Sequence, residues 1–174
     1  MEAAKNFDLI IKACTELKVA LKVYGTGSQE SYLKSIAGTN VEFLGRVSDE
    51  KKFELMANCK AFIVMAKDED FGITPVEAMA VGAPVIAYRG GGYLESVVEG
   101  PPSSRQSSGL RRGEGKTGVF VGECSVESLV GVLREFGIDG GRKIKPEDCR
   151  KQAEKFSKER FKKEIINFVK KNYD

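Results

Sequence analysis

The stretch KAFIVMAKDEDFGITPVEAMAVGAPVIAYRGGGYLES, residues 60–96, decides the fold class. It contains two apolar runs typical of strands, residues 60–66 and 84–89. Each run is followed by a polar or glycine-rich loop and then by a helical pattern. Strands that are apolar almost throughout are usually covered on both faces, as in parallel sheets. The stretch therefore predicts two consecutive strand–loop–helix units of an α/β fold.

The same alternation of strands and helices continues on both sides of this stretch. Further strands are expected within residues 19–27, 40–47 and 117–122, and helices within residues 7–17, 28–38, 49–59 and 125–137 and from residue 146 onward. This order predicts a single domain over residues 1–174, with a doubly wound, mainly parallel, Rossmann-like sheet and helices on both faces. Ligands of such sheets bind beyond the carboxyl ends of the strands.

Composition excludes several classes of protein. With 41% hydrophobic and 30% charged residues the chain is typical of a soluble globular protein, and its net charge of +3 is too small to indicate nucleic-acid binding. No apolar run reaches the length of a membrane span, and no signal peptide is visible. The chain has no histidine, and its 4 cysteines are widely spaced. We therefore expect reduced thiols in a cytoplasmic protein, with neither a zinc site nor a disulfide scaffold.

Two segments differ from the rest of the chain. Residues 101–115 are rich in proline, serine, glycine and arginine, which predicts a flexible insertion; a basic anion-binding loop is the alternative. Residues 157–174 combine helically spaced apolar residues with many lysines, which predicts an amphipathic helix. Such a helix could pack against another domain or contact an anionic membrane from the cytoplasmic side.

The acidic residues that follow the expected strand at residues 60–66 allow three interpretations. Asp68-Glu69-Asp70 could hold a divalent cation, matching the short DxD pattern that binds a nucleotide diphosphate through a metal, or could form a solvated turn. Phe71-Gly72 follows them and argues against a plain surface turn. Thr74-Pro75-Val76-Glu77 reads as a capping box, in which Glu77 would stabilise the start of the next helix.

Glycine-rich loops follow two of the expected strands. In RGGGY, residues 89–93, the glycines permit close approach of the backbone to a ligand, and the following helix offers free N–H groups for a diphosphate. GTGS, residues 25–28, has the same character but lacks the full GxGxxG spacing of a dinucleotide site. An ordinary strand-to-helix turn is the alternative for both loops.

The ordered set of motifs resembles the donor-binding, C-terminal half of the retaining glycosyltransferase family 4, which has the GT-B architecture. The resemblance rests on Glu69 and Glu77 in an E-x7-E spacing, on the surrounding FG, EAMA and GxPVIA motifs, and on GGYLE at residues 91–95. KNFDLIIKA, residues 5–13, and NVEFLGRVSDE, residues 40–50, fit in the same order. The match extends over residues 5–130, apart from the insertion.

This resemblance implies a nucleotide-sugar donor, commonly linked to UDP or GDP, from which mannose or another hexose passes to a glycan or lipid-linked acceptor. It implies that Glu69 contacts the donor sugar and stabilises the transition state and that Glu77 binds the ribose. It implies that Lys5 neutralises the diphosphate. The donor-binding set carried by the same motifs also includes Gly25, Gly27, Arg46, Phe71, Gly72, Gly91 and Gly92. The family generally needs no metal, so the resemblance implies no metal site and no cofactor, the nucleotide-sugar being a substrate.

The chain departs from the family pattern in three ways. The arginine that precedes the diphosphate lysine has no counterpart, the first strand of the domain is missing or cut short, and no N-terminal acceptor domain is present. We therefore expect nucleotide binding without useful turnover. The alternatives to this function are a nucleotide-sugar epimerase, which would need a histidine, and a non-catalytic α/β module binding a nucleotide or magnesium, for which Lys67 and Asp68 are the candidates.

Overall fold

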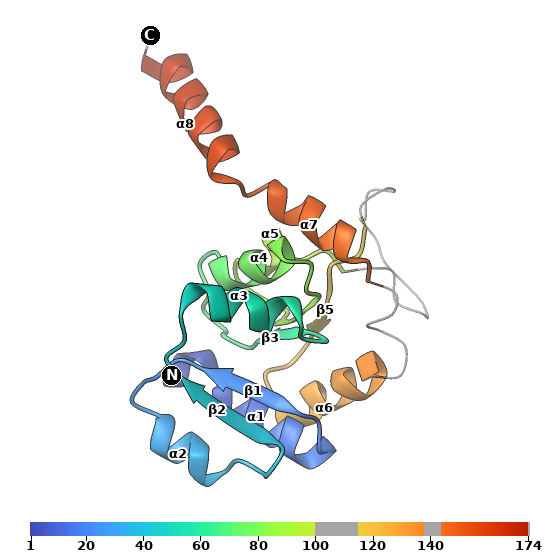
Figure 1. Cartoon of the computed structure of the whole chain (residues 1–174). Helices are drawn as coiled ribbons and strands as arrows, with labels where there is room; N and C mark the ends of the chain where they lie inside the picture. Colours follow the sequence, from blue (N-terminus) through green and yellow to red (C-terminus); the bar gives the residue numbers. More distant parts are fainter. Residues whose placement is uncertain (100–114, 138–143, 174) are drawn as a thin grey trace.

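The computed structural model describes residues 1–99, 115–137 and 144–173, so most of the expected insertion lies outside the described residues. Helices and strands alternate along the chain (Figure 1). Their bounds are η1 Ala3–Lys5, α1 Phe7–Leu17, β1 Leu21–Tyr24, α2 Glu30–Ser35, β2 Val41–Gly45, α3 Asp49–Ala57, β3 Phe62–Val64, α4 Ile73–Ala80, β4 Val85–Tyr88, α5 Tyr93–Ser96, β5 Gly118–Val121, α6 Val126–Glu135, α7 Pro146–Glu154 and α8 Lys158–Tyr173.

All strand pairs are parallel, which confirms the predicted fold class. Within residues 1–99, 115–137 and 144–173 the strands nevertheless form two sheets rather than one: β1 pairs with β2, and β3, β4 and β5 pair in that order. In the second sheet Phe62 lies opposite Val85, which in turn lies opposite Gly118. The central strand β4 is buried at Val85, Ile86 and Ala87, whereas all three residues of the edge strand β3 are only half-buried. The difference follows from β3 having a strand on one side only among the described residues.

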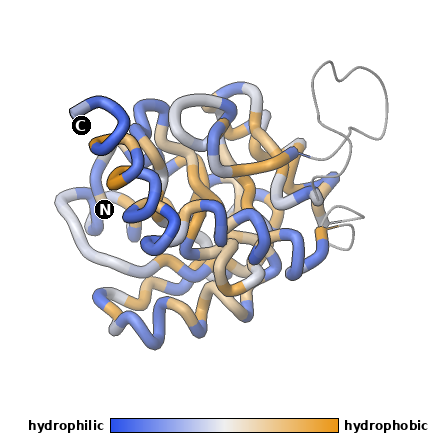
Figure 2. Tube along the Cα trace, turned by 90° about the horizontal axis from the view of Figure 1, so that it is seen from above, coloured by the Kyte–Doolittle hydropathy of each residue, from blue (hydrophilic) through white to orange (hydrophobic). Residues whose placement is uncertain are grey.

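Helices cover these strands and complete the core. Helix α1 packs against α6, and α4 packs against α7. The main core gathers residues from both faces around β4, including the fully buried Met79, Ile86 and Leu129. In Figure 2 the hydrophobic stretches gather toward the middle of the fold, and hydrophilic stretches line its outside.

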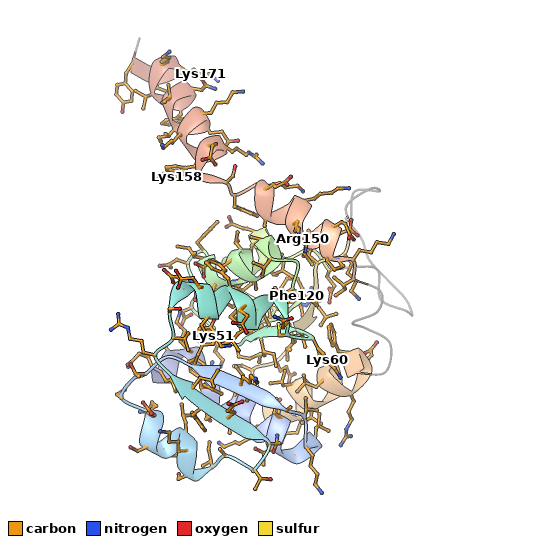
Figure 3. All side chains as sticks on the ribbon, viewed as in Figure 1. Lys51, Lys60, Phe120, Arg150, Lys158 and Lys171 are labelled. Carbon is orange, nitrogen blue, oxygen red and sulfur yellow. The ribbon has the colours of Figure 1, made fainter. Side chains whose placement is uncertain are left out.

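Helix α8 projects away from this body (Figure 1). It occupies most of the range in which an amphipathic helix is expected, and none of its residues is buried. Figure 3 marks Lys158 and Lys171 at its two ends. Among the described helices, none is both long enough and apolar enough to cross a membrane.

Two buried thiols should make folding sensitive to alkaline pH. Burial raises the pKa of Cys14 and of Cys149 to about 11, whereas a thiol in an unfolded chain titrates near ~8.5. Because the folded pKa is the higher one, the stability that each neutral thiol contributes is complete below pH ~8.5 and is lost as the pH rises toward the folded pKa. We expect the free energy of unfolding, measured by urea titration, to fall by up to ~1.4 kcal/mol per pH unit per thiol between about pH 8.5 and 11.

Cys149→Ala is the control for this prediction. It removes one of the thiols whose pKa is raised, so the pH dependence above pH ~8.5 should become weaker, whatever the variant's stability at neutral pH. An unchanged pH dependence would show that the thiols are not its cause.

Candidate functional site

The loops that follow β3 and β4 pack directly on each other. The Gly92 N–H donates to the Glu69 carbonyl oxygen at 2.7 Å. A Cβ at Gly91 would lie 2.5 Å from the same oxygen, and one at Gly92 would lie 2.5 Å from the Asp70 carbonyl oxygen and from Cα of Phe71. Only glycine allows this approach of two backbones. The predicted glycines therefore hold the acidic loop, and the Gly92 N–H, expected to face the diphosphate, is already used within the chain.

The side chain of Glu69 is the centre of this loop pair. Its Oε2 lies 2.6 Å from Nζ of Lys5 and accepts a longer hydrogen bond, 3.4 Å, from the Tyr93 hydroxyl. Lys5 ends η1, and the next residue, Asn6, donates to the Met65 carbonyl oxygen at 2.7 Å, which ties this end of the chain to the exit of β3. Burial is the main cause that raises the pKa of Tyr93, and the nearby Glu69 carboxylate raises it further. Lys5 and Glu69, predicted separately, thus form one ion pair.

The acids on either side of Glu69 behave differently from it. Asp68 and Asp70 are exposed, whereas the Glu69 side chain is only 19% exposed. Among the described residues, no three histidine, cysteine, aspartate or glutamate side chains gather into a possible metal site. The acidic run is therefore one inward carboxylate between two solvated flanks.

Glu77 lies on α4, but the predicted capping box is wrong. The helix begins at Ile73, with Gly72 as its N-cap at a left-handed φ of 78°, so Thr74 already lies inside the helix. Gly72 can take this conformation because it lacks a Cβ, which would lie 2.9 Å from the Tyr93 ring. The Glu77 carboxylate consequently does not cap the helix. It accepts a hydrogen bond at 3.0 Å from Nζ of Lys52, on α3.

Sequence reasoning missed Lys52, which lies four residues after Ser48, the residue that caps α3. Its ammonium group also lies 3.3 Å from Asp49 Oδ1 and 4.6 Å from the centroid of the Phe53 ring. The hydrogen bond to Glu77 is the main cause that raises the pKa of Lys52. No local motif marks this residue, because its partner is brought close only when α3 packs against α4 (Figure 1).

Near this second pair, β1 and β2 end together. The Gly25 N–H, at a φ of 101°, donates to the Gly45 carbonyl oxygen at 2.7 Å. Gly25 therefore lies beside the start of the loop that carries the exposed Arg46. Burial raises the pKa of Tyr24 to about 12, while the charge of Lys52 lowers it and that of Glu77 raises it. Tyr24 thus lies within the electrostatic reach of the Lys52–Glu77 pair.

Two of the predicted donor-binding residues, Gly27 and Phe71, have neighbours other than the Lys5–Glu69 and Lys52–Glu77 pairs. Gly27 lies against the backbone of Met1, whose amino group bonds to the Thr26 carbonyl oxygen. The exposed Phe71 ring makes an edge contact with Phe156, with 5.5 Å between the ring centroids. The structure thus gathers Lys5, Glu69, Gly72, Gly91 and Gly92 in one cluster and Glu77 in another, with Gly25 and Arg46 at the neighbouring strand ends.

Comparison with known proteins gives related sequences. Residues 1–156 match the family described as glycosyl transferases group 1. The human alpha-1,3/1,6-mannosyltransferase ALG2 is 31% identical over 145 residues, covering 79% of this chain and 30% of the human protein. An uncharacterized glycosyltransferase of Methanocaldococcus jannaschii is 33% identical over 100 residues, covering 55% of this chain and 28% of that protein. The chain spans less than a third of the length of both relatives.

Solved structures share the fold. Sucrose-phosphate synthase of Thermosynechococcus elongatus has a TM-score of 0.77 at 19% sequence identity, with 98% of this chain and 43% of the synthase covered. Anabaena HepE in complex with UDP-glucose has a TM-score of 0.68 at 21% identity, with 98% and 46% covered. Each structure contains this arrangement within a chain more than twice as long.

Proposed function

Because the chain belongs to the glycosyl transferases group 1 family, we propose that it binds the nucleotide-sugar donor of a sugar-transfer reaction. Its membership confirms the resemblance drawn from the sequence. The donor is a UDP- or GDP-linked hexose, and the mannosyltransferase activity named for the human relative favours mannose. The transfer retains the anomeric configuration, and the acceptor is a glycan or lipid-linked molecule held by a second, N-terminal domain.

The observation that carries the proposal is the Lys5–Glu69 pair at the exit of β3. Transfer breaks the bond between the anomeric carbon and the diphosphate, so negative charge grows on the diphosphate and positive charge on the sugar. The Lys5 ammonium can compensate the negative charge on the diphosphate electrostatically, and the Glu69 carboxylate can accept hydrogen bonds from sugar hydroxyls. Glu77, at the second cluster, is assigned to the ribose. These groups need no metal ion for their proposed roles.

Nucleotide titration tests the proposal. We expect calorimetry to show selective binding of UDP or GDP over ADP, unchanged by omission of Mg²⁺. Glu77→Ala should weaken that binding about tenfold, because a charge-assisted hydrogen bond to the nucleotide is lost. Binding that requires Mg²⁺ and does not distinguish the nucleotides would contradict the proposal and favour the magnesium-binding module instead.

A further inference from the structure

We propose that Lys52 is a positioning residue for the donor nucleotide: its ammonium group fixes the Glu77 carboxylate so that it recognises the hydroxyls of the ribose. This inference rests on the proposed function and adds a determinant of specificity to it. Lys52 and Glu77 come from different helices and are 25 residues apart in sequence, yet Nζ lies 3.0 Å from Oε1. Their side chains are 19% and 27% exposed.

The Lys52 side chain is held by more than Glu77. Asp49 Oδ1 lies 3.3 Å from its ammonium group, and the Phe53 ring lies beneath it. A lysine with several fixed contacts loses little freedom when it orients a partner, whereas a lysine in solvent would have to be ordered first. The neighbouring Lys51 is the contrast: its side chain is 49% exposed and pairs with Glu54 within the same helix.

This arrangement leaves part of the Glu77 carboxylate available to a ligand. Lys52 bonds to Oε1, and within the described part of the chain no residue bonds to Oε2. An ionised carboxylate offers about four lone-pair sites, so one ammonium contact does not exhaust it. Two adjacent hydroxyls of a ribose are donors suited to the remaining sites. The fixed carboxylate would therefore bind the ribose through these hydroxyls, and a nucleotide without them would gain nothing from it.

The experiment compares UDP or GDP, whichever the chain binds, with its 2′,3′-dideoxy form. The unaltered chain should prefer the ribonucleotide by about tenfold. In Lys52→Met the ribonucleotide should bind about 5- to 10-fold more weakly while the dideoxy form keeps its affinity within about twofold, so the preference disappears. Lys51→Met, on the same helix (Figure 3), should change neither affinity. Lys52→Met should add no further loss to Glu77→Ala, since both act through one contact.

The outcomes distinguish failure of the positioning role of Lys52 from failure of the proposed function. Equal weakening of both nucleotides in Lys52→Met would show a general charge effect and would overturn the positioning role, as would a preserved preference. If Lys52→Met is poorly folded, Lys52→Arg is used, which keeps the charge and should retain most of the preference. Failure of the unaltered chain to bind any nucleotide would overturn the proposed function, and this inference with it.

Discussion

Gly91→Ala should be strongly destabilising and should abolish most of the nucleotide binding. Gly91 has a φ of 54°, and its added Cβ would lie 2.5 Å from the Glu69 carbonyl oxygen. A left-handed φ costs a residue with a side chain about 1–2 kcal/mol, and overpacking costs about 1–3 kcal/mol. The neighbouring atom is backbone rather than the end of a flexible side chain, so relief requires the acidic loop to move. That movement would displace Glu69 from Lys5.

Gly122→Ala is the matched control for this substitution. Gly122 also follows a strand, but nothing lies within 4 Å of the Cβ it would gain. Urea unfolding and nucleotide titration of both variants test the prediction: Gly122→Ala should be close to the unaltered chain in both measurements. If Gly91→Ala matched this control, the close packing of the two loops would not be needed for either folding or binding.

Lys5→Met and Glu69→Gln should change the affinity for a nucleoside diphosphate in opposite directions. Lys5→Met removes the cation proposed to bind the diphosphate, and a lost charged hydrogen bond lowers affinity about 10- to 100-fold. Glu69→Gln removes the carboxylate that pairs with the same ammonium group at 2.6 Å. The anionic ligand then no longer competes with the Glu69 carboxylate for Lys5 and has one like charge fewer beside it, so UDP or GDP should bind more tightly, by up to about tenfold.

Three further measurements test the roles proposed for Lys5 and Glu69. Lys5 is 51% exposed, so its contribution should weaken as salt rises. Lys12→Met is the control, since Lys12 pairs with Asp8 along α1 and should not affect binding. With a nucleotide-sugar in place of the diphosphate, Glu69→Gln should lose affinity, because the sugar hydroxyls lose their acceptor. Loss of diphosphate affinity in Glu69→Gln would contradict the proposed competition for Lys5.

The sequence determined the order and kind of the elements. Apolar residues at helical spacing predicted residues 7–17 as a helix, and α1 spans Phe7–Leu17. A helix was predicted from residue 49, and Ser48, a residue type typical of the N-cap position, accepts the Lys51 N–H with its side chain. Continuous apolar runs predicted parallel strands, and every pair is parallel. The helix and its cap depend on the backbone and on neighbours within about one helical turn, so a local pattern is enough to specify them. The parallel pairing follows instead from the order in which strands and helices alternate along the chain.

Only the tertiary structure decided how the candidate site is assembled. Helix α4 begins at Ile73 and not after the predicted cap, Thr74, because Gly72 takes a left-handed φ against Tyr93. The tertiary structure also gave Glu77 a partner, Lys52, that no motif indicates. Lys5 and Glu69 are 64 residues apart, and they meet where the Asn6 side chain ties the start of α1 to the exit of β3. Such contacts depend on how helices and loops pack, and the same local spacing is compatible with many packings.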